Sequence, residues 1–101
     1  MVRLFLVTSE EARLRIDAAL ANGHAHVAQA AAHHLFSSAA QLRLGVIAEL
    51  AERVETAARA GDLTAAQTLA TEMTAGLAAA AVELRQFLAE LPGAASVVVV
   101  D

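Results

Sequence analysis

The feature that most constrains this chain is the absence of proline from its first 91 residues, combined with a high content of alanine. Proline interrupts helices, whereas alanine has the highest helix propensity and leaves little bulk between packed helices. Only 3% of the residues are aromatic, and the sequence has no Trp or Tyr. Because 101 residues fit one domain, we expect a single all-α domain whose helices pack closely.

Short breaks divide this helix-forming sequence into long segments. Asn22-Gly23 and Ala60-Gly61 are typical of helix ends, and Asp62 is a favourable N-cap for the segment that follows. Thr8 and Glu11 have the spacing of a capping box and predict the start of the first long helix. We expect long helices at residues 8–21, 24–41, 45–60 and 63–91. Short links favour antiparallel neighbours, so the predicted fold is an up-down four-helix bundle with a short N-terminal helical segment at residues 1–7. The alternative for these residues is a lid over one end of the bundle.

The end of the sequence differs from the rest. Val97-Val98-Val99-Val100 are four consecutive β-branched residues, which favour extended structure over helix. We therefore divide the chain into a bundle at residues 1–93 and a C-terminal tail at 94–101. The tail is interpreted as a terminal segment that packs on the bundle, and a docking strand is the alternative.

Charge and composition exclude several classes of function. The net charge of −4, with 7 Lys and Arg residues, argues against a nucleic-acid partner, because phosphate backbones require clustered cations. The absence of cysteine excludes disulfides and thiolate metal sites and fits a reducing compartment. No apolar run reaches the roughly 18 residues that a membrane span needs. We expect a cytoplasmic protein without a membrane segment.

The most informative stretch of the chain surrounds His33. At about 100° per residue, an apolar stripe falls on the opposite side of the predicted helix, so His33 is expected to face water. Its neighbours Ala30, Ser37 and Ala40 are small. An exposed imidazole on a low, rigid surface, with no pocket, is accessible to a docked protein. The residues of the predicted buried stripe are Val27, Ala31, Leu35, Ser38 and Leu42.

The other histidines and the acidic residues do not suggest a metal or acid–base site. His33 with His34, and His24 with His26, point too far apart on a helix to share an ion. His26 and His33 share a face but lie about 10 Å apart along the axis, so no metal or cofactor is expected. His34 is predicted to be partly covered at the stripe's edge. The acidic residues are interpreted as exposed helix-surface or helix-start charges: Glu10, Glu11, Glu49, Glu52 and Glu55.

The run Ala32-His33-His34-Leu35-Phe36-Ser37-Ser38 resembles the pattern Ala-His-x-Leu-Lys-Gly-Ser of histidine-containing phosphotransfer (HPt) domains, which serve multistep phosphorelays. The similarity extends to the segments 16–23 and 49–62 and covers about residues 4–90. Two positions depart from the family pattern. Phe36 replaces the lysine that in the family lies near the phosphoryl group, and Ser37 replaces the glycine that leaves room for the partner.

The resemblance implies a monomeric phosphocarrier in a two-component phosphorelay rather than a stand-alone enzyme. His33 would accept a phosphoryl group from receiver-domain aspartates and donate it to them. Response-regulator receiver domains are the expected partners, with a hybrid sensor histidine kinase as a further partner class. A neutral imidazole nitrogen is the nucleophile, and the receiver supplies the metal ion and charge-stabilising groups. The chain itself then needs no cofactor.

We expect a partner-docking surface around His33, in which Arg43 partly substitutes for the missing lysine. Phe36 is predicted to lie beside His33 with part of its ring exposed, and covering of a neighbouring helix is the other interpretation. The expected docking residues are Gln29, Ala30, Phe36, Ser37, Ala40 and Arg43.

Two other functions remain open from the sequence. The first is a degenerate helical docking module of the same fold that binds signalling proteins without carrying phosphate. The second is a four-helix coat or chaperone-like bundle unrelated to signalling. Uptake of phosphate at His33 separates the phosphocarrier from both.

Overall fold

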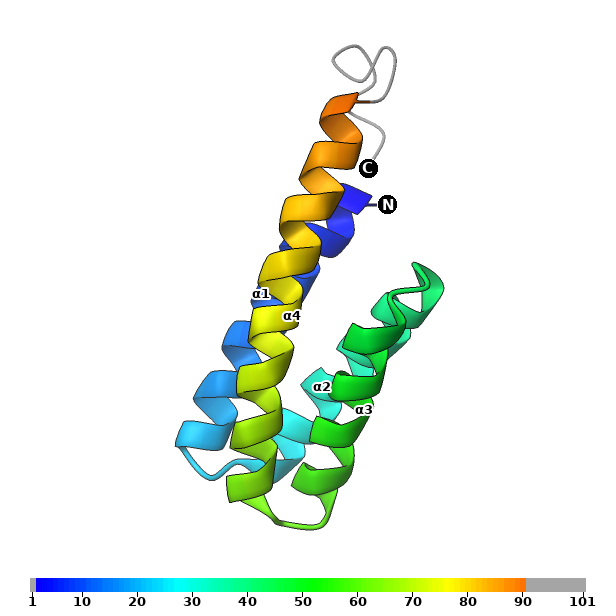
Figure 1. Cartoon of the computed structure of the whole chain (residues 1–101). Helices are drawn as coiled ribbons and strands as arrows, with labels where there is room; N and C mark the ends of the chain where they lie inside the picture. Colours follow the sequence, from blue (N-terminus) through cyan, green and yellow to red (C-terminus); the bar gives the residue numbers. More distant parts are fainter. Residues whose placement is uncertain (1, 91–101) are drawn as a thin grey trace.

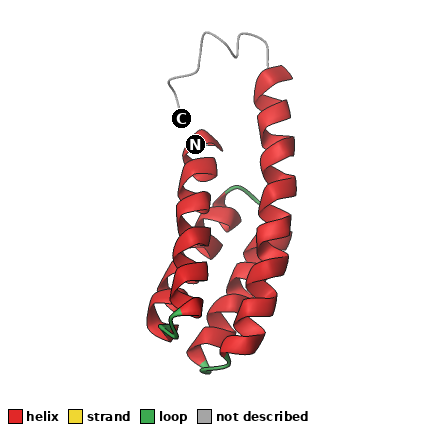
Figure 2. Ribbon diagram, turned by 90° about the vertical axis from the view of Figure 1, so that its left-hand side faces the viewer, coloured by secondary structure: helices red, strands yellow, loops and turns green. Residues whose placement is uncertain are grey.

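The computed structural model describes residues 2–90 and contains the four predicted helices. They alternate in direction along the bundle, as Figures 1 and 2 show, so the predicted antiparallel up-down four-helix bundle is confirmed. The Val2 end of α1 and the Glu90 end of α4 project beyond the α2–α3 hairpin (Figure 1). The helices are α1 (Val2–Ala21), α2 (Ala25–Gln41), α3 (Gly45–Arg59) and α4 (Leu63–Glu90).

The predicted tail at 94–101, including Val97 to Val100, lies outside the described residues, and the division of the chain at residue 93 stays a prediction. Within residues 2–90, every helix is too short or too polar to cross a membrane.

One of the two predicted capping sites is confirmed and the other is wrong. Asp62 Oδ1 accepts a hydrogen bond from the Ala65 N–H at 3.1 Å, as an N-cap of α4 should. Thr8, by contrast, lies inside α1, and its Oγ1 donates to the Leu4 carbonyl at 2.8 Å. A threonine hydroxyl can bond back to the preceding turn without ending a helix. The predicted N-terminal segment is therefore the beginning of α1 itself and not a separate helix.

The three turns share one geometry at the helix end. Gly23, Arg43 and Gly61 have positive φ angles of 73°, 58° and 78°. The next N–H in each turn donates to the carbonyl five residues earlier, which is the bond of a Schellman motif. Glycine accepts this conformation freely, whereas an L-residue such as Arg43 is disfavoured by about 1–2 kcal/mol. The three bonds are His24 N to Ala19 O (2.8 Å), Leu44 N to Ala39 O (2.9 Å) and Asp62 N to Ala57 O (3.0 Å).

Charged side chains link successive turns on the surface of α1. Arg13 pairs with Glu10 and with Asp17, the latter at 3.1 Å. The hydrogen bond from Arg13 lowers the pKa of Glu10, and the positive charge of Arg85 on α4 adds a smaller lowering. That influence is consistent with antiparallel packing of α4 along α1. The two carboxylates are exposed to water, so the pairs contribute little to stability.

The centre of the bundle contains one large residue from each helix, surrounded by alanines. Ile16, Leu35, Val54 and Met73 are each less than 2% exposed. Small side chains leave little bulk between the helix backbones, so the helices can approach closely. The fully buried alanines are Ala28, Ala32 and Ala39 of α2, Ala51 of α3 and Ala66 of α4.

The buried face of α2 is rotated relative to the predicted stripe. Val27 is 45% exposed, so its prediction as a core residue is wrong. Ala28 and Ala32 take the central positions instead, because the face that packs on the bundle consists mainly of alanine. Leu35 is buried as predicted, and Leu42 packs against the core while remaining half-buried.

Replacement of Leu35 tests this core. We expect Leu35→Ala to lower the free energy of unfolding by about 2–5 kcal/mol, because it removes a buried side chain and leaves a cavity. Urea denaturation followed by circular dichroism measures the change. Val46→Ala is the control: its side chain is 71% exposed, and its effect should stay within about 0.5 kcal/mol. A loss below about 1 kcal/mol for Leu35→Ala would contradict the described packing.

Candidate functional site

The imidazole of His33 lies on the surface of α2 above the tightly packed backbone. Its side chain is 62% exposed, whereas the preceding Ala32 is fully buried and Leu35 is 1% exposed. The predicted exposure of His33 is therefore confirmed. Because the backbone on both sides is anchored in the core, the ring is presented from a rigid part of the helix.

The ring contacts one acidic side chain on the neighbouring helix. His33 Nδ1 lies 3.2 Å from Oε1 of Glu55 on α3, 22 residues further along the chain. Only 11% of the Glu55 side chain is exposed. The prediction of Glu55 as an exposed helix-surface charge is therefore wrong. Its position between Ala51 and Ala58 brings it to the edge of the buried face of α3.

The second oxygen of Glu55 is also occupied. Arg59 Nη2 donates to Glu55 Oε2 at 2.8 Å, one turn further along α3. Burial disfavours the negative charge of the Glu55 carboxylate, and the positive charge of Arg59 offsets this cost. We call this connected set, His33, Glu55 and Arg59, the His33–Glu55–Arg59 chain. It ties α2 to α3 at the surface of the bundle.

The His33–Glu55–Arg59 chain determines which nitrogen of the imidazole is free to react. A carboxylate can only accept hydrogen bonds, so Nδ1 must carry the proton when it bonds to Glu55. The lone pair of a neutral ring is then on Nε2, away from Glu55. A nitrogen lone pair held at an exposed position is the group that a nucleophilic histidine requires.

The position of Phe36 fits both interpretations from the sequence, a ring beside His33 and a ring that covers part of the bundle. Its ring centroid is 6.2 Å from that of His33, with the two planes inclined by 39°. The side chain is half-buried and packs against the core. One edge of the histidine site is therefore apolar and closed by this ring.

A shallow depression between α2 and α3 borders His33. The histidine and Glu55 line it together with His26, Gln29 and Ala30, all three from the preceding turns of α2. The depression is wide open to solvent, which agrees with the low surface without a pocket that the sequence predicts around His33. Gln29 is half-buried and Ala30 is exposed.

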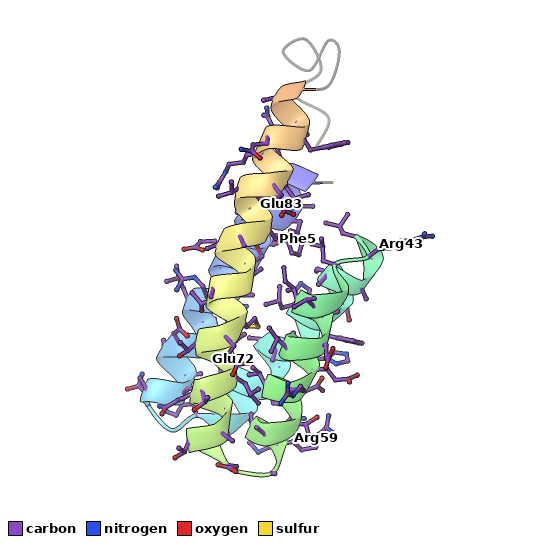
Figure 3. All side chains as sticks on the ribbon, in the orientation of Figure 1. Phe5, Arg43, Arg59, Glu72 and Glu83 are labelled. Atoms are coloured by element: carbon purple, nitrogen blue, oxygen red, sulfur yellow. The ribbon has the colours of Figure 1, made fainter. Side chains whose placement is uncertain are left out.

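The remaining predicted docking residues lie on the other side of His33. Ser37 and Ala40 are exposed on the next turns of α2. Arg43 lies beyond the end of α2, at the tip of the α2–α3 hairpin, and Figure 3 shows it pointing away from the bundle. Figure 3 places Arg59 near the opposite end of α3. The structure thus does not bring Arg43 to the imidazole, whereas Arg59 is connected to it through Glu55.

The other histidines differ from His33 in their contacts. His34 is exposed, so the prediction of a partly covered position is wrong. His24 occupies the N-cap position of α2, and its side chain makes no capping hydrogen bond. Within residues 2–90, no three His, Asp or Glu side chains are grouped as a metal site would require.

Sequence reasoning could have found Glu55 by one signal. Glu55 and Arg59 have the i, i+4 spacing of a helical ion pair. Glu55 also falls beside the apolar positions of its helix, which is unusual for an acidic residue without a partner. The contact with His33 was not predictable from spacing, because it depends on how α2 and α3 pack.

The chain was compared with protein families, with curated proteins and with solved structures. A family model described as Hpt domain matches residues 1–94 of the chain. No curated protein and no solved structure matches it.

The ring orientation can be tested by nitrogen NMR of the histidine side chains. We expect the neutral His33 ring to carry its proton on Nδ1, because Glu55 accepts there. Glu55→Ala should convert His33 to a mixture of the two tautomers, while His24 keeps its spectrum. A wild-type His33 ring with its proton on Nε2 would contradict the described contact.

Proposed function

The chain belongs to the Hpt domain family, and we propose that His33 is the residue by which it accepts and donates phosphoryl groups. Hpt domains are phosphocarrier modules of two-component signalling, and they interact with receiver domains and kinases. The observation that carries the proposal is the combination of an exposed imidazole with an Nδ1 that contacts Glu55, which leaves Nε2 as the nucleophilic nitrogen.

The choice of His33 among the four histidines rests on this contact. Its ring is accessible, lies in the middle of a helix and has a carboxylate partner from another helix. His34 is also exposed, but it points about 100° away around the helix, which removes it from Glu55. A receiver that docks over His33 would therefore not meet both rings in the same orientation.

The proposed reaction is a reversible transfer between His33 and a receiver aspartate. The Nε2 lone pair attacks phosphorus, a nitrogen–phosphorus bond forms, and the bond from phosphorus to the aspartyl oxygen breaks. The receiver carboxylate is the leaving group, and its divalent metal ion stabilises the charge on the phosphoryl oxygens. In the reverse direction the aspartate attacks the phosphohistidine and Nε2 leaves.

Glu55 supports this transfer by stabilising the ring during attack. As Nε2 bonds to phosphorus, the imidazole gains positive charge, and the hydrogen bond from Nδ1 to the carboxylate becomes charge-assisted. Hydrogen bonds of this kind contribute about 1.5–3 kcal/mol. Glu55 makes no bond to phosphorus and is therefore a positioning residue.

Arg59 limits the repulsion that Glu55 would otherwise exert on the phosphoryl group. A carboxylate about 6 Å from one phosphoryl charge is unfavourable by about 1–3 kcal/mol at an effective dielectric of 20–80. The ion pair with Arg59 offsets much of that repulsion. From the sequence, we expect Arg43 to substitute partly for the missing lysine. We assign this cationic role to Arg59 instead.

We propose that the receiver docks on the small residues around His33 and on Phe36. Ala30, Ser37 and Ala40 are exposed and leave space for a close approach. Gln29 and Phe36 are half-buried along one side of this surface. We keep Arg43, which lies beyond the end of α2, as its most distant member. The domain would act as a monomer, since one copy carries the whole site.

The replacements at Phe36 and Ser37 favour one alternative, a docking module of the same fold that carries no phosphate. Such a module would keep the docking surface around His33 but would not transfer phosphoryl groups. It predicts binding to receivers without label on His33, and the next experiment distinguishes it.

Substitution of each adjacent histidine tests the phosphoacceptor. We expect His33→Gln to abolish uptake of acid-labile, base-stable label from phosphorylated receivers, while His34→Gln keeps most of it. The stability of His33→Gln should change by no more than about 0.5 kcal/mol, because the ring is exposed. Equal loss in both variants would contradict the assignment, and binding without uptake by the wild type would favour the docking module.

Phe36→Lys tests the departure from the family pattern. We expect faster transfer from receivers, because their active sites are rich in carboxylates and a cation beside His33 favours encounter. The gain should shrink as salt rises, since the Debye length is about 8 Å at physiological ionic strength. Gln41→Lys adds the same charge at the end of α2 and should have little effect. Tenfold weaker binding, or about 1.4 kcal/mol, would instead make Phe36 an apolar anchor.

A further inference from the structure

We propose that the phosphoryl group on His33 is received on the N-terminal side of the ring, in the depression between α2 and α3. Gln29 donates hydrogen bonds to the phosphoryl oxygens there, and His26 forms the far wall. This inference rests on the proposed phosphoacceptor role of His33. It adds a subsite on this chain that the pattern around the histidine does not contain.

The direction of helical side chains supports this placement. Each Cα–Cβ bond of an α-helix tilts toward the N-terminus, so a side chain covers the turn before its own Cα. The turn before His33 contains Gln29 and Ala30, and both line the depression with the imidazole. A group attached to Nε2 is therefore brought over this turn rather than over Ser37.

The two sides of the ring also differ in chemistry. On the C-terminal side, the half-buried Phe36 presents an aromatic surface to His33, which offers no hydrogen bond to an anion. On the N-terminal side, the Gln29 amide offers two N–H donors. Ala30, in the same turn, is small and exposed, which leaves room for the phosphoryl oxygens.

The charge at the bottom of the depression is already paired. Both Glu55 oxygens are engaged, one by His33 Nδ1 at 3.2 Å and the other by Arg59 at 2.8 Å. The carboxylate can therefore lie near the phosphoryl group with reduced repulsion. The proposed subsite thus combines the uncharged Gln29 amide with a compensated ion pair.

A negative charge placed at Gln29 tests this subsite without any receiver. Potassium phosphoramidate is the phosphodonor: Nε2 attacks its phosphorus, the phosphorus–nitrogen bond breaks, and ammonia leaves. We expect Gln29→Glu to lower the initial rate of phosphohistidine formation at least fivefold, measured by phosphorus NMR. A small donor makes the result independent of the protein-docking surface.

Two matched variants show on which side of His33 along α2 a negative charge has the larger effect. Gln41→Glu is the same substitution about 12 Å further along α2 from His33, and its rate should stay within twofold of the wild type. Ser37→Glu places the carboxylate one turn from His33 on the other side, and its decrease should be smaller than that of Gln29→Glu. Helical circular dichroism and the urea midpoint verify that all three variants are folded.

A second measurement reads the contact directly in the wild-type protein. Phosphorylation of His33 should shift the NMR signals of the Gln29 amide and the His26 ring more than those of Gln41 and His24. This result does not depend on any substitution and would support the subsite even where a variant lost stability.

The outcomes separate this inference from the proposed function. If the wild type forms phosphohistidine at His33 but Gln29→Glu behaves like Gln41→Glu, the subsite is wrong and the phosphocarrier role stands. A larger decrease for Ser37→Glu than for Gln29→Glu places the phosphoryl group on the Phe36 side and also overturns it. If neither phosphoramidate nor any receiver phosphorylates His33, both the proposed function and the subsite fail.

Discussion

The close contact between α2 and α3 is the constraint on which the rest of the site depends. Ala28, Ala32 and Ala39 of α2 and Ala51 and Ala58 of α3 are at most 1% exposed. Small residues at a helix interface let the backbones approach, which brings Glu55 within reach of His33. A larger side chain at these positions would separate the helices. Packing of the core thus sets the geometry of a surface imidazole.

The same interface explains why a charged residue can occupy a nearly buried position. Glu55 would be costly there alone, because a desolvated carboxylate needs partners for its oxygens. Arg59 and His33 supply one partner each, from the same helix and from the neighbouring one. In the described residues no buried side-chain nitrogen or oxygen lacks a hydrogen bond. The pairing therefore links α2 to α3 while it orients the ring.

The sequence predicted the fold better than the site because the two depend on different information. Helix ends followed from local chemistry: Gly23 and Gly61 accept positive φ, and Asp62 caps the next helix. Thr8 was misinterpreted because a hydroxyl that can cap can equally bond within a helix. Helix content and order could thus be derived from residues a few positions apart.

The errors in the predicted site share a different cause. Val27 was placed in the core and Glu55 at the surface, although Val27 is 45% exposed and Glu55 nearly buried. Both positions lie at the boundary of a buried face, where a small rotation of the helix decides the environment. That rotation depends on how the helices pack against one another, which spacing within one helix does not specify. The rotation of α2 does not change the exposure of His33, because His33 lies far from the boundary of the buried face.

Phe36 shows how packing and recognition compete at one position. Its ring covers part of the core and also lies 6.2 Å from the imidazole. A lysine can keep its aliphatic stem on an apolar surface while its ammonium group reaches water, but it covers less area than a phenyl ring. The aromatic ring therefore favours closure of the bundle over a local positive charge. His33 also makes a polar contact with Glu55, so that an approaching protein would meet an apolar group and a hydrogen-bonding group beside the same ring. Such an asymmetric surface restricts the orientations in which a partner can dock, because rotation of the partner would bring apolar groups against unpaired polar ones.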